Sequence, residues 1–559
     1  MVEDGLVVRP LVRSDVQRQP RGPLVLVILD GVGVGRGDEF DAVESALTPT
    51  LDGLKSGGLF RTLRAHGTAV GLASDADMGN SEVGHNTLGA GRIFDQGANL
   101  VDKAIASGAI WSSDWPMLTA AANEPGRTLH LIGLLSDGGV HSDISHLLAL
   151  IERASVDGVG RLRVHVLLDG RDVPDFTATQ YVETLEHALA VVNDVGERDY
   201  RIASGGGRMS TTMDRYGANW SIVQKGWEAH VLGVARGFPS AFDAITRFRQ
   251  ENPGVSDQDL PAFTIVEEGN AVGTIEDGDA VIVFNFRGDR SIEISEALVA
   301  GRGFSHFDRV RRPKVIFASM SCYDVERGFP EHYLVHPPQV EGTVSEYLAR
   351  SGIAQFACAE TQKFGHVTYF WNGNRQEKFD EKLETYVEIP SDQVPFQSAP
   401  AMKSTETATL VDDAIASGEF GFVRTNFPGG DMVGHTADLD ATRRAIESID
   451  AAIAQILGAV ERAHGCLVVT ADHGNAEDMV ERDSAGTPER DAEGNFRMKT
   501  AHSLSPVPFL VRDFGERRFG LRPDEPDAGL ANVAATLVEL LGFTPPEPFQ
   551  PSLLEWPST

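Results

Sequence analysis

Residues 466–475, CLVVTADHGN, join a short apolar run to a turn that carries two polar side chains, Asp472 and His473. Short apolar runs that end at a turn are typical of buried strands. In open parallel sheets, ligand sites lie beyond the carboxyl ends of the strands, where the loops diverge. A carboxylate and an imidazole at such a strand end predict a metal site.

Two other stretches repeat this pattern. Residues 24–30, LVLVILD, are an apolar run that ends at Asp30, and residues 421–435 run through FVRTNF into GGDMVGH. Asp431 and His435 are four residues apart, so one helical turn or a tight loop would point both the same way. Three strand ends therefore supply five candidate metal ligands: Asp30, Asp431, His435, Asp472 and His473.

The composition limits what such a site can serve. The chain of 559 residues has a net charge of -32, from 81 acidic and 49 basic residues. Because this field repels phosphate backbones and anionic lipids, we expect neither a nucleic acid nor a membrane as a partner, and an anionic substrate would need a local basic pocket. Residues 1–22 lack the apolar stretch of a signal peptide, and no window holds the ~18 apolar residues of a spanning helix.

The cysteines indicate the compartment. Cys322, Cys358 and Cys466 lie far apart without C-x-x-C spacing. This usage favours a reducing, cytoplasmic environment over a disulfide framework. The high charge and the absence of heptads make a monomer the default expectation.

Residues 78–92, MGNSEVGHNTLGAGR, contain a serine with two interpretations. Ser81 could cap a helix N-terminus, with Glu82 in the first turn. Alternatively, Ser81 could be a nucleophile at that N-terminus, where free backbone N–H groups can hold a transferring phosphoryl group. The residues alone leave both interpretations open.

From about Ala98 onward, the predicted strand ends carry arginines rather than metal ligands. Predicted strands at 129–135, 163–168, 201–204 and 281–286 precede loops with the following residues: His141, Arg171, Asp172, Arg208, Arg215, Arg287 and Arg290. Guanidinium groups match carboxylate and phosphate geometry, so five arginines in such loops predict a pocket for a small polyanion. Any one of them alone could be a surface ion pair.

Two more candidates follow or precede predicted strands. Lys363 comes after residues 355–359 and could neutralise phosphate oxygens or lower a nucleophile's pKa, although a solvated surface lysine is the default. His502 precedes a predicted strand at 507–511. A lone histidine there is more often structural, but an open metal site needs a second nitrogen ligand.

The pattern of elements predicts the architecture. Predicted strands alternate with helical stretches such as residues 439–463, which predicts an α/β fold with mostly parallel sheets. Metal candidates come from both ends of the chain, and the proline-rich residues 335–341, VHPPQVE, predict a linker. We expect two domains: a discontinuous metal domain of residues 1–97 and 336–559, interrupted by an inserted transferase domain of residues 98–335 that binds substrate.

The motifs, taken in order, resemble those of cofactor-independent phosphoglycerate mutase from about residue 24 to residue 543. The motifs that carry the resemblance are LDGVG, MGNSEVGHNTLGAGR, SDGGVHS, DGRDV, GGGRM with TMDRY, FNFRGDR, AETQKFGHVT, GDMVGHT, TADHGNAEDM and TAHSLSPVP. The chain is similar to the longer of two sequence variants of the family. Arg208 and Arg215 are seven residues apart, where the shorter form has six, and Asp143 stands where that form has a second histidine.

The resemblance implies an isomerase of the alkaline phosphatase superfamily. It would interconvert 3-phosphoglycerate and 2-phosphoglycerate in glycolysis and gluconeogenesis, without a bisphosphoglycerate cofactor and through a phosphoserine on Ser81. Two divalent ions are implied. One would be held by Asp431, His435 and His502, and the other by Asp30, Ser81, Asp472 and His473. Oxygen and imidazole ligands admit manganese, our first expectation, and also magnesium, cobalt or zinc.

The resemblance also implies a substrate pocket made of His141, Arg171, Asp172, Arg208, Arg215, Arg287, Arg290 and Lys363. We expect Asp172 to move the proton of the glycerate hydroxyl, and Lys363 to neutralise charge beside Ser81. Two other functions stay open: a metal-dependent phosphatase or sulfatase of the same superfamily, and a non-catalytic protein that binds metals or phosphometabolites.

Overall fold

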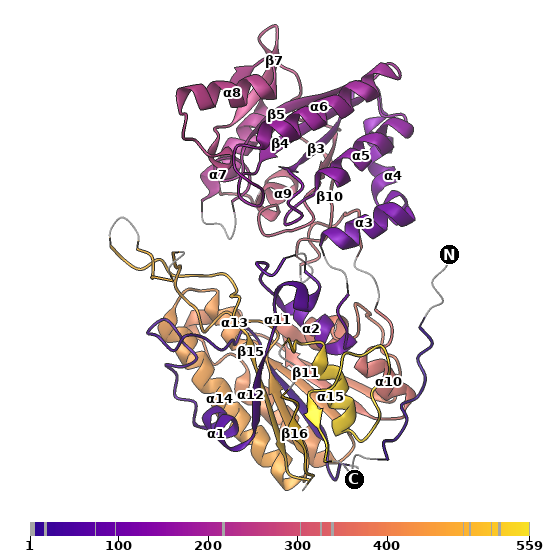
Figure 1. The fold of residues 1–559 in the computed structure, drawn as a ribbon, viewed down its shortest axis with the longest axis vertical. Helices are drawn as coiled ribbons and strands as arrows, with labels where there is room; N and C mark the ends of the chain where they lie inside the picture. Colours follow the sequence, from indigo (N-terminus) through magenta and orange to yellow (C-terminus); the bar gives the residue numbers. More distant parts are fainter. Residues whose placement is uncertain are drawn as a thin grey trace. The chain divides into compact units, whose positions relative to one another are not determined.

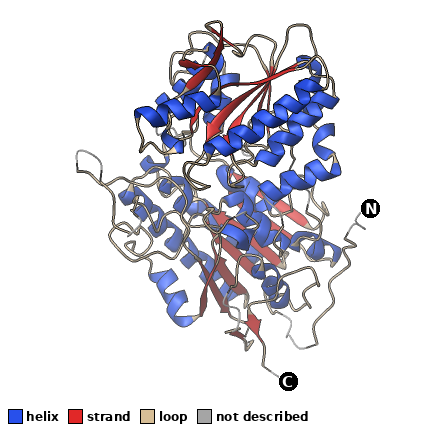
Figure 2. Ribbon diagram, turned by 45° about the horizontal axis from the view of Figure 1, so that its top comes forward, coloured by secondary structure: helices blue, strands red, loops and turns tan. Residues whose placement is uncertain are grey.

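The computed structural model describes residues 6–15, 20–72, 74–94, 97–214, 219–301, 303–324, 327–336, 340–483, 486–490, 494–515, 517–523 and 527–557. The chain divides into two compact units, Met1–Phe94 with Pro338–Thr559 and Asp95–Pro337. Each unit is a β-sheet with helices on both faces, as Figures 1 and 2 show, which confirms the predicted α/β class.

The functional boundaries expected near Ala98 and Val335 stay predictions, because compactness does not test what each unit does. The predicted linker, residues 335–341, includes residues 337–339, which lie outside the described part of the chain.

The first unit contains a seven-stranded sheet in the order β12-β11-β13-β1-β14-β15-β2 among the described residues. Its strands are β1 (Leu24–Leu29), β2 (Leu59–Leu63), β11 (Gln355–Glu360), β12 (Glu384–Ile389), β13 (Phe422–Phe427), β14 (Cys466–Thr470) and β15 (Val507–Asp513). The first five strands in this order, from β12 through β11, β13 and β1 to β14, are parallel to one another. Strand β15 pairs antiparallel with both β14 and β2. The short strands β16 (Gly520–Leu521) and β17 (Leu554–Glu555) pair with each other.

The central strands of this sheet are buried on both faces. Every residue of β1, β13 and β14 is buried, which explains why their sequences are nearly continuous apolar runs. Helices α12 and α14 pack together on one face, while α2, α10 and α15 lie on the other (Figure 1). The helices are α1 (Pro49–Gly57), α2 (Ser81–Ala90), α10 (Val344–Arg350), α11 (Thr361–Gly365), α12 (Ser404–Ser417), α13 (Gly429–Gly434), α14 (Leu439–Arg462) and α15 (Asn532–Leu540).

The second unit contains a sheet in the order β10-β9-β3-β4-β5-β7-β6, with β8 paired to β7. The strands are β3 (Leu129–Leu135), β4 (Arg161–Leu168), β5 (Asp199–Gly207), β6 (Arg236–Phe238), β7 (Phe263–Glu267), β8 (Asn270–Ala271), β9 (Ala280–Val283) and β10 (Ile316–Ser319). The helices are α3 (Ala98–Ser107), α4 (Trp115–Ala122), α5 (Ile144–Val156), α6 (Ala178–Asp194), α7 (Trp220–Trp227), α8 (Ala241–Glu251) and α9 (Ile292–Val299).

Alternate residues of β3 face two different cores. Leu129 and Leu131 pack with the helices α4, α5, α6 and α8, whereas Ile132 packs with α7 and α9 on the opposite face. The same alternation places His130 on the second face, beside Ile132.

Two predicted strand ends were wrong. The glycines 205–207 do not form a loop but continue β5, and a β-carbon at Gly205 or Gly207 would collide with neighbouring backbone. The strand predicted at 281–286 ends at Val283 instead. Beyond it, the side chain of Asn285 turns inward and accepts a hydrogen bond from the backbone N–H of Leu134 at 2.9 Å.

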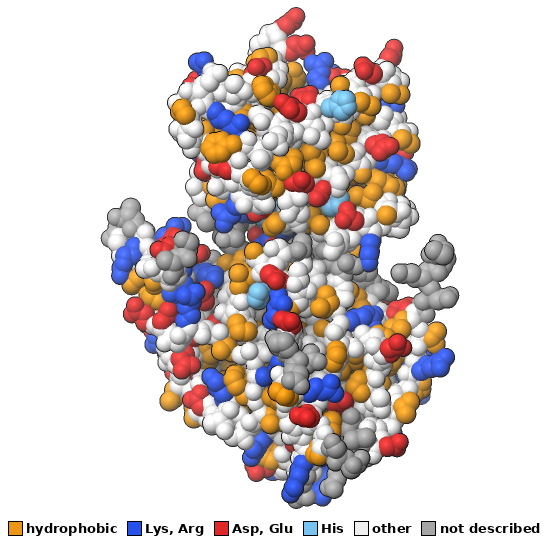
Figure 3. Space-filling view, viewed as in Figure 1, with side chains coloured by type: hydrophobic (Ala, Val, Ile, Leu, Met, Phe, Trp, Pro, Cys, Tyr) orange, Lys and Arg blue, Asp and Glu red, His pale blue; other side chains and the backbone are white. Residues whose placement is uncertain are grey.

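The surface carries mixed charge. On the face seen in Figure 3, acidic and basic side chains are interspersed over each unit. None of the helices in the described residues has both the length and the apolar composition needed to cross a membrane.

Close packing of α2 against backbone generates a stability prediction. A β-carbon at Gly89 would collide with the carbonyl oxygen of Trp371, whereas one at Gly53 in α1 would meet open space. We expect Gly89→Ala to destabilise the protein by about 1–3 kcal/mol through overpacking. The matched control, Gly53→Ala, should stabilise it by about 0.5–1 kcal/mol. Urea unfolding followed by circular dichroism measures both, and a neutral Gly89→Ala would contradict this packing.

Candidate metal centre and anion pocket

Three adjacent parallel strands end at the candidate metal centre. Strand β1 lies between β13 and β14 in the sheet. Asp30 follows β1, Asp472 and His473 follow β14, and Asp431 lies on α13, just beyond β13. Because parallel strands bring their carboxyl ends to one edge, side chains from positions 30, 431 and 472 meet there.

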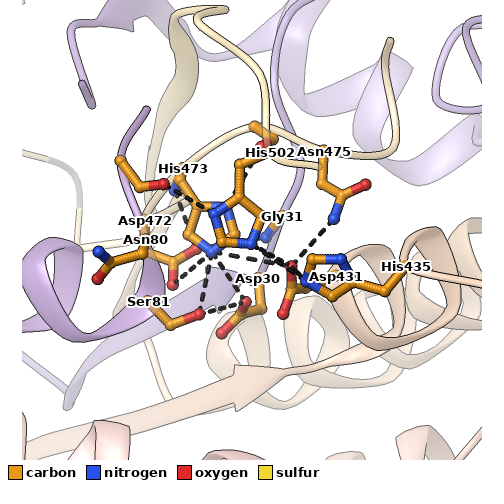
Figure 4. A network of polar contacts seen from close by, with 12 residues as sticks. Asp30, Gly31, Asn80, Ser81, Asp431, His435, Asp472, His473, Asn475 and His502 are labelled. Carbon is orange, nitrogen blue, oxygen red and sulfur yellow. Dashed lines mark hydrogen bonds and ion pairs between the residues drawn. The ribbon is translucent and has the colours of Figure 1, made fainter. Parts of the chain in front are cut away.

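Ser81 is the first residue of α2, but it does not cap the helix. The cap is Asn80, whose side chain accepts from the backbone N–H of Val83 at 2.9 Å. The capping interpretation of Ser81 is therefore wrong, and its hydroxyl is directed into the site (Figure 4). Ser81 Oγ lies 3.1 Å from Asp30 Oδ1 and 3.0 Å from His473 Nε2.

Lys363 lies among the same side chains. Its Nζ is 2.7 Å from Ser81 Oγ, 2.9 Å from Asp431 Oδ2 and 3.2 Å from Asp30 Oδ1. The lysine is 3% exposed, so the default interpretation as a surface residue is wrong. Its ammonium group supplies positive charge between two buried carboxylates.

This charge shifts the pKa values of the carboxylates. Burial opposes ionisation of Asp30, but Lys363 and His473 hold the pKa of Asp30 well below its ordinary value. The pKa of Asp431 is also well below its ordinary value, because Lys363 and His435 outweigh the effect of burial. Both carboxylates are therefore ionised at neutral pH, as metal ligands must be.

His435 and His502 have the arrangement of metal ligands. Their Nε2 atoms lie 3.1 Å apart, and each is 3.1 Å from Asp431 Oδ1. His435 Nδ1 is 2.5 Å from the carbonyl oxygen of Thr500, and His502 Nδ1 is 2.8 Å from that of Gly79. Since a carbonyl only accepts, both Nδ1 atoms carry the proton in the neutral rings, and the two Nε2 lone pairs face each other.

The donor set fits divalent cations. Two facing imidazole nitrogens beside a carboxylate can share a cation, and oxygen with imidazole ligands suits manganese, magnesium, cobalt or zinc. The ligand atoms of three groups each lie within 4.8 Å of one another: Asp431, His435 and His502; Asp30, Asp431 and His473; Asp30, His85 and Asp472. All predicted ligands are thus brought together.

The histidines differ in proton affinity. Burial disfavours the charged form of His473, but the carboxylates of Asp472, Asp30 and Asp431 raise its pKa to about 10. Burial lowers the pKa of His502 to about 4, and His473 adds to this effect. An ion bound among the carboxylates would replace the proton on His473.

The sequence interpretation missed the residues that support the ligands. His85 Nδ1 lies 2.8 Å from the carbonyl oxygen of Ser81 and 3.2 Å from Asp472 Oδ2. Asn426 Nδ2 donates to Asp30 Oδ2 at 2.7 Å, and Asn475 Nδ2 donates to Asp431 Oδ1 at 3.1 Å. The spacing of His85, one helical turn after Ser81, was a signal that could have identified it.

Glu477 connects the loops around the centre. Its Oε2 accepts from the backbone N–H groups of Gly33 and Asn475 at 2.8 and 2.9 Å, and its Oε1 accepts from the hydroxyl of Ser503. The carboxylate, 1% exposed, thereby holds together loops that follow β1, follow β14 and precede β15.

The second unit gathers most of the predicted anion-binding residues. His141 Nδ1 lies 3.4 Å from Asp289 Oδ1, and Arg287 Nε lies 3.2 Å from the same oxygen. Burial lowers the pKa of His141 well below its ordinary value; Asp289 opposes the shift, and three nearby guanidinium groups add to it: Arg208, Arg287 and Arg290.

Arg208 forms ion pairs with two carboxylates of the protein itself. It is 1% exposed, and its Nη1 donates to Asp169 Oδ1 at 2.8 Å and to Asp172. Its Nε has no hydrogen-bond partner among the described residues. The side chain of Arg171 is exposed, and Arg215 lies outside the described residues.

The cysteines have no disulfide partner among the described residues. Cys358 and Cys466 are buried and Cys322 is intermediate in exposure, and all three are free.

The fold and the donor set define a metalloenzyme. The family model described as the Metalloenzyme superfamily matches residues 22–545. A protein of Trypanosoma brucei brucei named 2,3-bisphosphoglycerate-independent phosphoglycerate mutase is 54% identical over 540 residues, which cover 96% of this chain and 98% of that protein. An Arabidopsis thaliana protein, named probable 2,3-bisphosphoglycerate-independent phosphoglycerate mutase 2, is 51% identical over 549 residues, or 97% of each chain.

A solved structure agrees with these relatives. The crystal structure of Leishmania mexicana phosphoglycerate mutase at low cobalt concentration is 51% identical, with a TM-score of 0.66, over 98% of this chain and 100% of that chain. The chain belongs to the 2,3-bisphosphoglycerate-independent phosphoglycerate mutases, within the Metalloenzyme superfamily.

The position of Lys363 generates a prediction about the metal-free protein. Lys363→Met would leave Asp30 and Asp431 as buried carboxylates without this ammonium group. We expect a loss of about 3–5 kcal/mol of stability in EDTA, the usual cost of breaking a buried ion pair. Manganese should restore part of the loss by neutralising the same carboxylates.

Thermal unfolding with EDTA and with manganese measures both effects. Lys403→Met, which removes a lysine paired with Asp392 at 2.7 Å, is the control and should change stability little. Equal losses for Lys363→Met in EDTA and in manganese would contradict the prediction.

Proposed function

We propose that this protein interconverts 3-phosphoglycerate and 2-phosphoglycerate through a phosphoserine on Ser81, without a bisphosphoglycerate cofactor. The observation that carries the proposal is the position of the Ser81 hydroxyl. Asn80, not Ser81, caps α2, and Ser81 Oγ lies 2.7 Å from Lys363 Nζ. Family membership supports the same reaction.

We further propose two divalent ions, with manganese as the first candidate. Asp431, His435 and His502 would hold one, and Asp30, Ser81, Asp472 and His473 the other. When bound, such ions neutralise phosphoryl oxygens and lower the pKa of a nearby hydroxyl. Lys363 would add positive charge beside the same oxygens.

The N-terminus of α2 would help to hold the phosphoryl group. Ser81 is the first residue of a ten-residue helix, whose first-turn backbone N–H groups have no acceptor within the helix. Those groups and the helix dipole favour a negative charge at Ser81. The phosphoryl group would move from the O3 of the glycerate to Ser81 Oγ, and then from Oγ to O2.

The second unit would hold the glycerate between these two transfers. Arg287 and Arg290 would bind its carboxylate, with His141 also facing the substrate and Arg171 and Arg215 as the other residues of the pocket. Ser81 would attack as the alkoxide and leave as the alkoxide, while Asp172, protonated at the start, would protonate the departing O3 and then accept the proton of O2, so that no net proton is taken up or released. Arg208, which donates to Asp172, would orient that carboxylate.

The domain roles follow from this division. The metal domain would comprise residues 1–97 and 336–559, and the inserted transferase domain residues 98–335. We also propose a cytoplasmic monomer, which the free cysteines support.

Two other functions predict different products. A phosphatase or sulfatase would transfer the group to water, but the arginines of the second unit favour retention of an anionic acceptor. A non-catalytic binding protein would not need a hydroxyl among metal ligands, so Ser81 argues against it.

The test is incubation with 3-phosphoglycerate and manganese. We expect 2-phosphoglycerate as the product, loss of activity with chelator, and phosphate on Ser81 by mass spectrometry of quenched enzyme. Ser81→Ala should eliminate transfer while leaving the fold intact, because Asn80 still caps α2. Free phosphate as the main product would indicate a phosphatase, and activity near wild type in Ser81→Ala would contradict the phosphoserine.

Retention of glycerate generates a prediction for Arg287. Loss of one charge-assisted contact to the carboxylate should cost about 1.5–3 kcal/mol of glycerate binding. Glycerate would then leave earlier, and water would hydrolyse more of the phosphoserine. We expect Arg287→Ala to raise the ratio of phosphate released to 2-phosphoglycerate formed. An unchanged ratio with only a raised KM would limit Arg287 to substrate capture.

A further inference from the structure

A chain of buried hydrogen bonds crosses the sheet of the second unit, and the mechanism above does not use it. Its six side chains are each at most 2% exposed. From end to end they are Asp279, His130, His165, Ser204, His230 and Thr212, and the five links measure 3.2, 2.9, 2.7, 2.7 and 2.8 Å. Three of the members come from the adjacent central strands β3, β4 and β5.

The chain has one consistent direction of donation. Both carboxylate oxygens of Asp279 act as acceptors, because Oδ1 accepts from the backbone N–H of Thr128 at 2.9 Å and Oδ2 from that of Glu276 at 2.8 Å. In the contact between Asp279 Oδ2 and His130 Nε2, the donor is therefore His130. Burial lowers the pKa of all three histidines, that of His230 to about 3, so the rings are neutral. A neutral imidazole donates once and accepts once.

Every link therefore donates toward Asp279. His165 donates from Nε2, the Ser204 hydroxyl donates to His165, and His230 donates from Nδ1 to Ser204. At the far end, the hydroxyl of Thr212 donates to His230 Nε2. This order leaves no buried nitrogen of the three rings without a partner.

Thr212 has an uncommon backbone conformation. Its φ is 71°, in the left-handed region, which is costly for a β-branched residue. Its hydroxyl is enclosed: a β-carbon at Gly226 of α7 would collide with Thr212 Oγ1. The Thr212 N–H donates to the carbonyl oxygen of Ile222 at 2.8 Å. The hydrogen bond to His230 is one of the contacts that hold this conformation.

The next residue contacts the anion pocket. The side chain of Met213 packs against Leu134 and Leu167, and its carbonyl oxygen accepts from Arg290 Nη1 at 2.8 Å. The backbone of Thr212 sets the direction of the following peptide group. Met213 alone therefore separates the last residue of the hydrogen-bond chain, Thr212, from the hydrogen bond to Arg290.

We propose that the buried histidine chain is a positioning device for the substrate-binding arginine Arg290. The chain holds Thr212 in the left-handed conformation. In this conformation, the carbonyl oxygen of the next residue, Met213, accepts the hydrogen bond from the Arg290 guanidinium. Packing alone does not require this chain, because apolar side chains such as Ile132 fill neighbouring positions on the same face. The inference rests on the proposed function for its ligand, a phosphoglycerate.

The test compares Thr212→Val, which keeps the shape and removes the hydroxyl, with Thr212→Ser, which keeps the hydroxyl. Thr264→Val is the matched control, since Thr264 is 2% exposed and its hydroxyl has no partner among the described residues. Calorimetry gives the Kd of 3-phosphoglycerate with manganese present, and kinetics give KM and kcat.

We expect Thr212→Val to raise Kd and KM about tenfold, the equivalent of 1.4 kcal/mol, with a smaller change in kcat. Thr212→Ser and Thr264→Val should bind like the wild type. An unchanged Kd in Thr212→Val, or equal losses in the valine and serine variants, would overturn the inference and leave the proposed function standing. A wild-type protein that does not bind 3-phosphoglycerate would overturn the proposed function as well.

A second measurement needs no substitution at Thr212. Imidazole ¹⁵N NMR of the wild type, with signals assigned through His130→Gln, His165→Gln and His230→Gln, should find the proton on Nε2 of His130 and His165 and on Nδ1 of His230. The His230 N–H signal should shift when 3-phosphoglycerate binds. Another tautomer pattern, or a His230 N–H signal that does not shift when 3-phosphoglycerate binds, would overturn the inference. This test applies even if Thr212→Val fails to fold.

Discussion

Buried negative charge at the ends of three adjacent strands is the constraint on which the first unit depends. Asp30 and Asp431 are at most 2% exposed, and water cannot solvate them there. Removing such charges from water costs several kcal/mol per ion unless opposite charge compensates. Lys363 and His473 supply positive charge, and the donor set around them fits divalent cations. The requirement for cations links the stability of the fold to its metal chemistry.

Two glycines allow α2 to lie close to the metal centre. Gly84 and Gly89 lack side chains where α2 meets the backbone of Asp472 and Trp371. This contact brings the helix N-terminus to the strand ends, so that Ser81 reaches Asp30 and His473. Asn80 caps the helix, so the Ser81 hydroxyl contacts Asp30 and His473 instead of the helix backbone.

The second unit uses charge differently. Its arginines are neutralised within the protein to different degrees: Arg208 donates to Asp169 and Asp172, while Arg287 lies near Asp289. Internal pairing fixes a guanidinium group in place at low entropic cost before a ligand arrives. The proposed pocket would therefore select an anion by geometry as well as by charge, which suits a small carboxylate better than an extended polyanion.

The sequence by itself determined the α/β class, the strands 24–29 and 129–135, and the meeting of Asp30, Asp431 and Asp472 at one edge of a sheet, because buried parallel strands are continuous apolar runs and their carboxyl ends lie at one edge. Only the tertiary structure decided the role of Asn80 as the cap, the burial of Lys363 and the hydrogen-bond chain from Thr212 to Asp279. These depend on contacts between residues distant in the chain. Local patterns cannot report them, since the direction of a side chain and the partner it meets are set by packing.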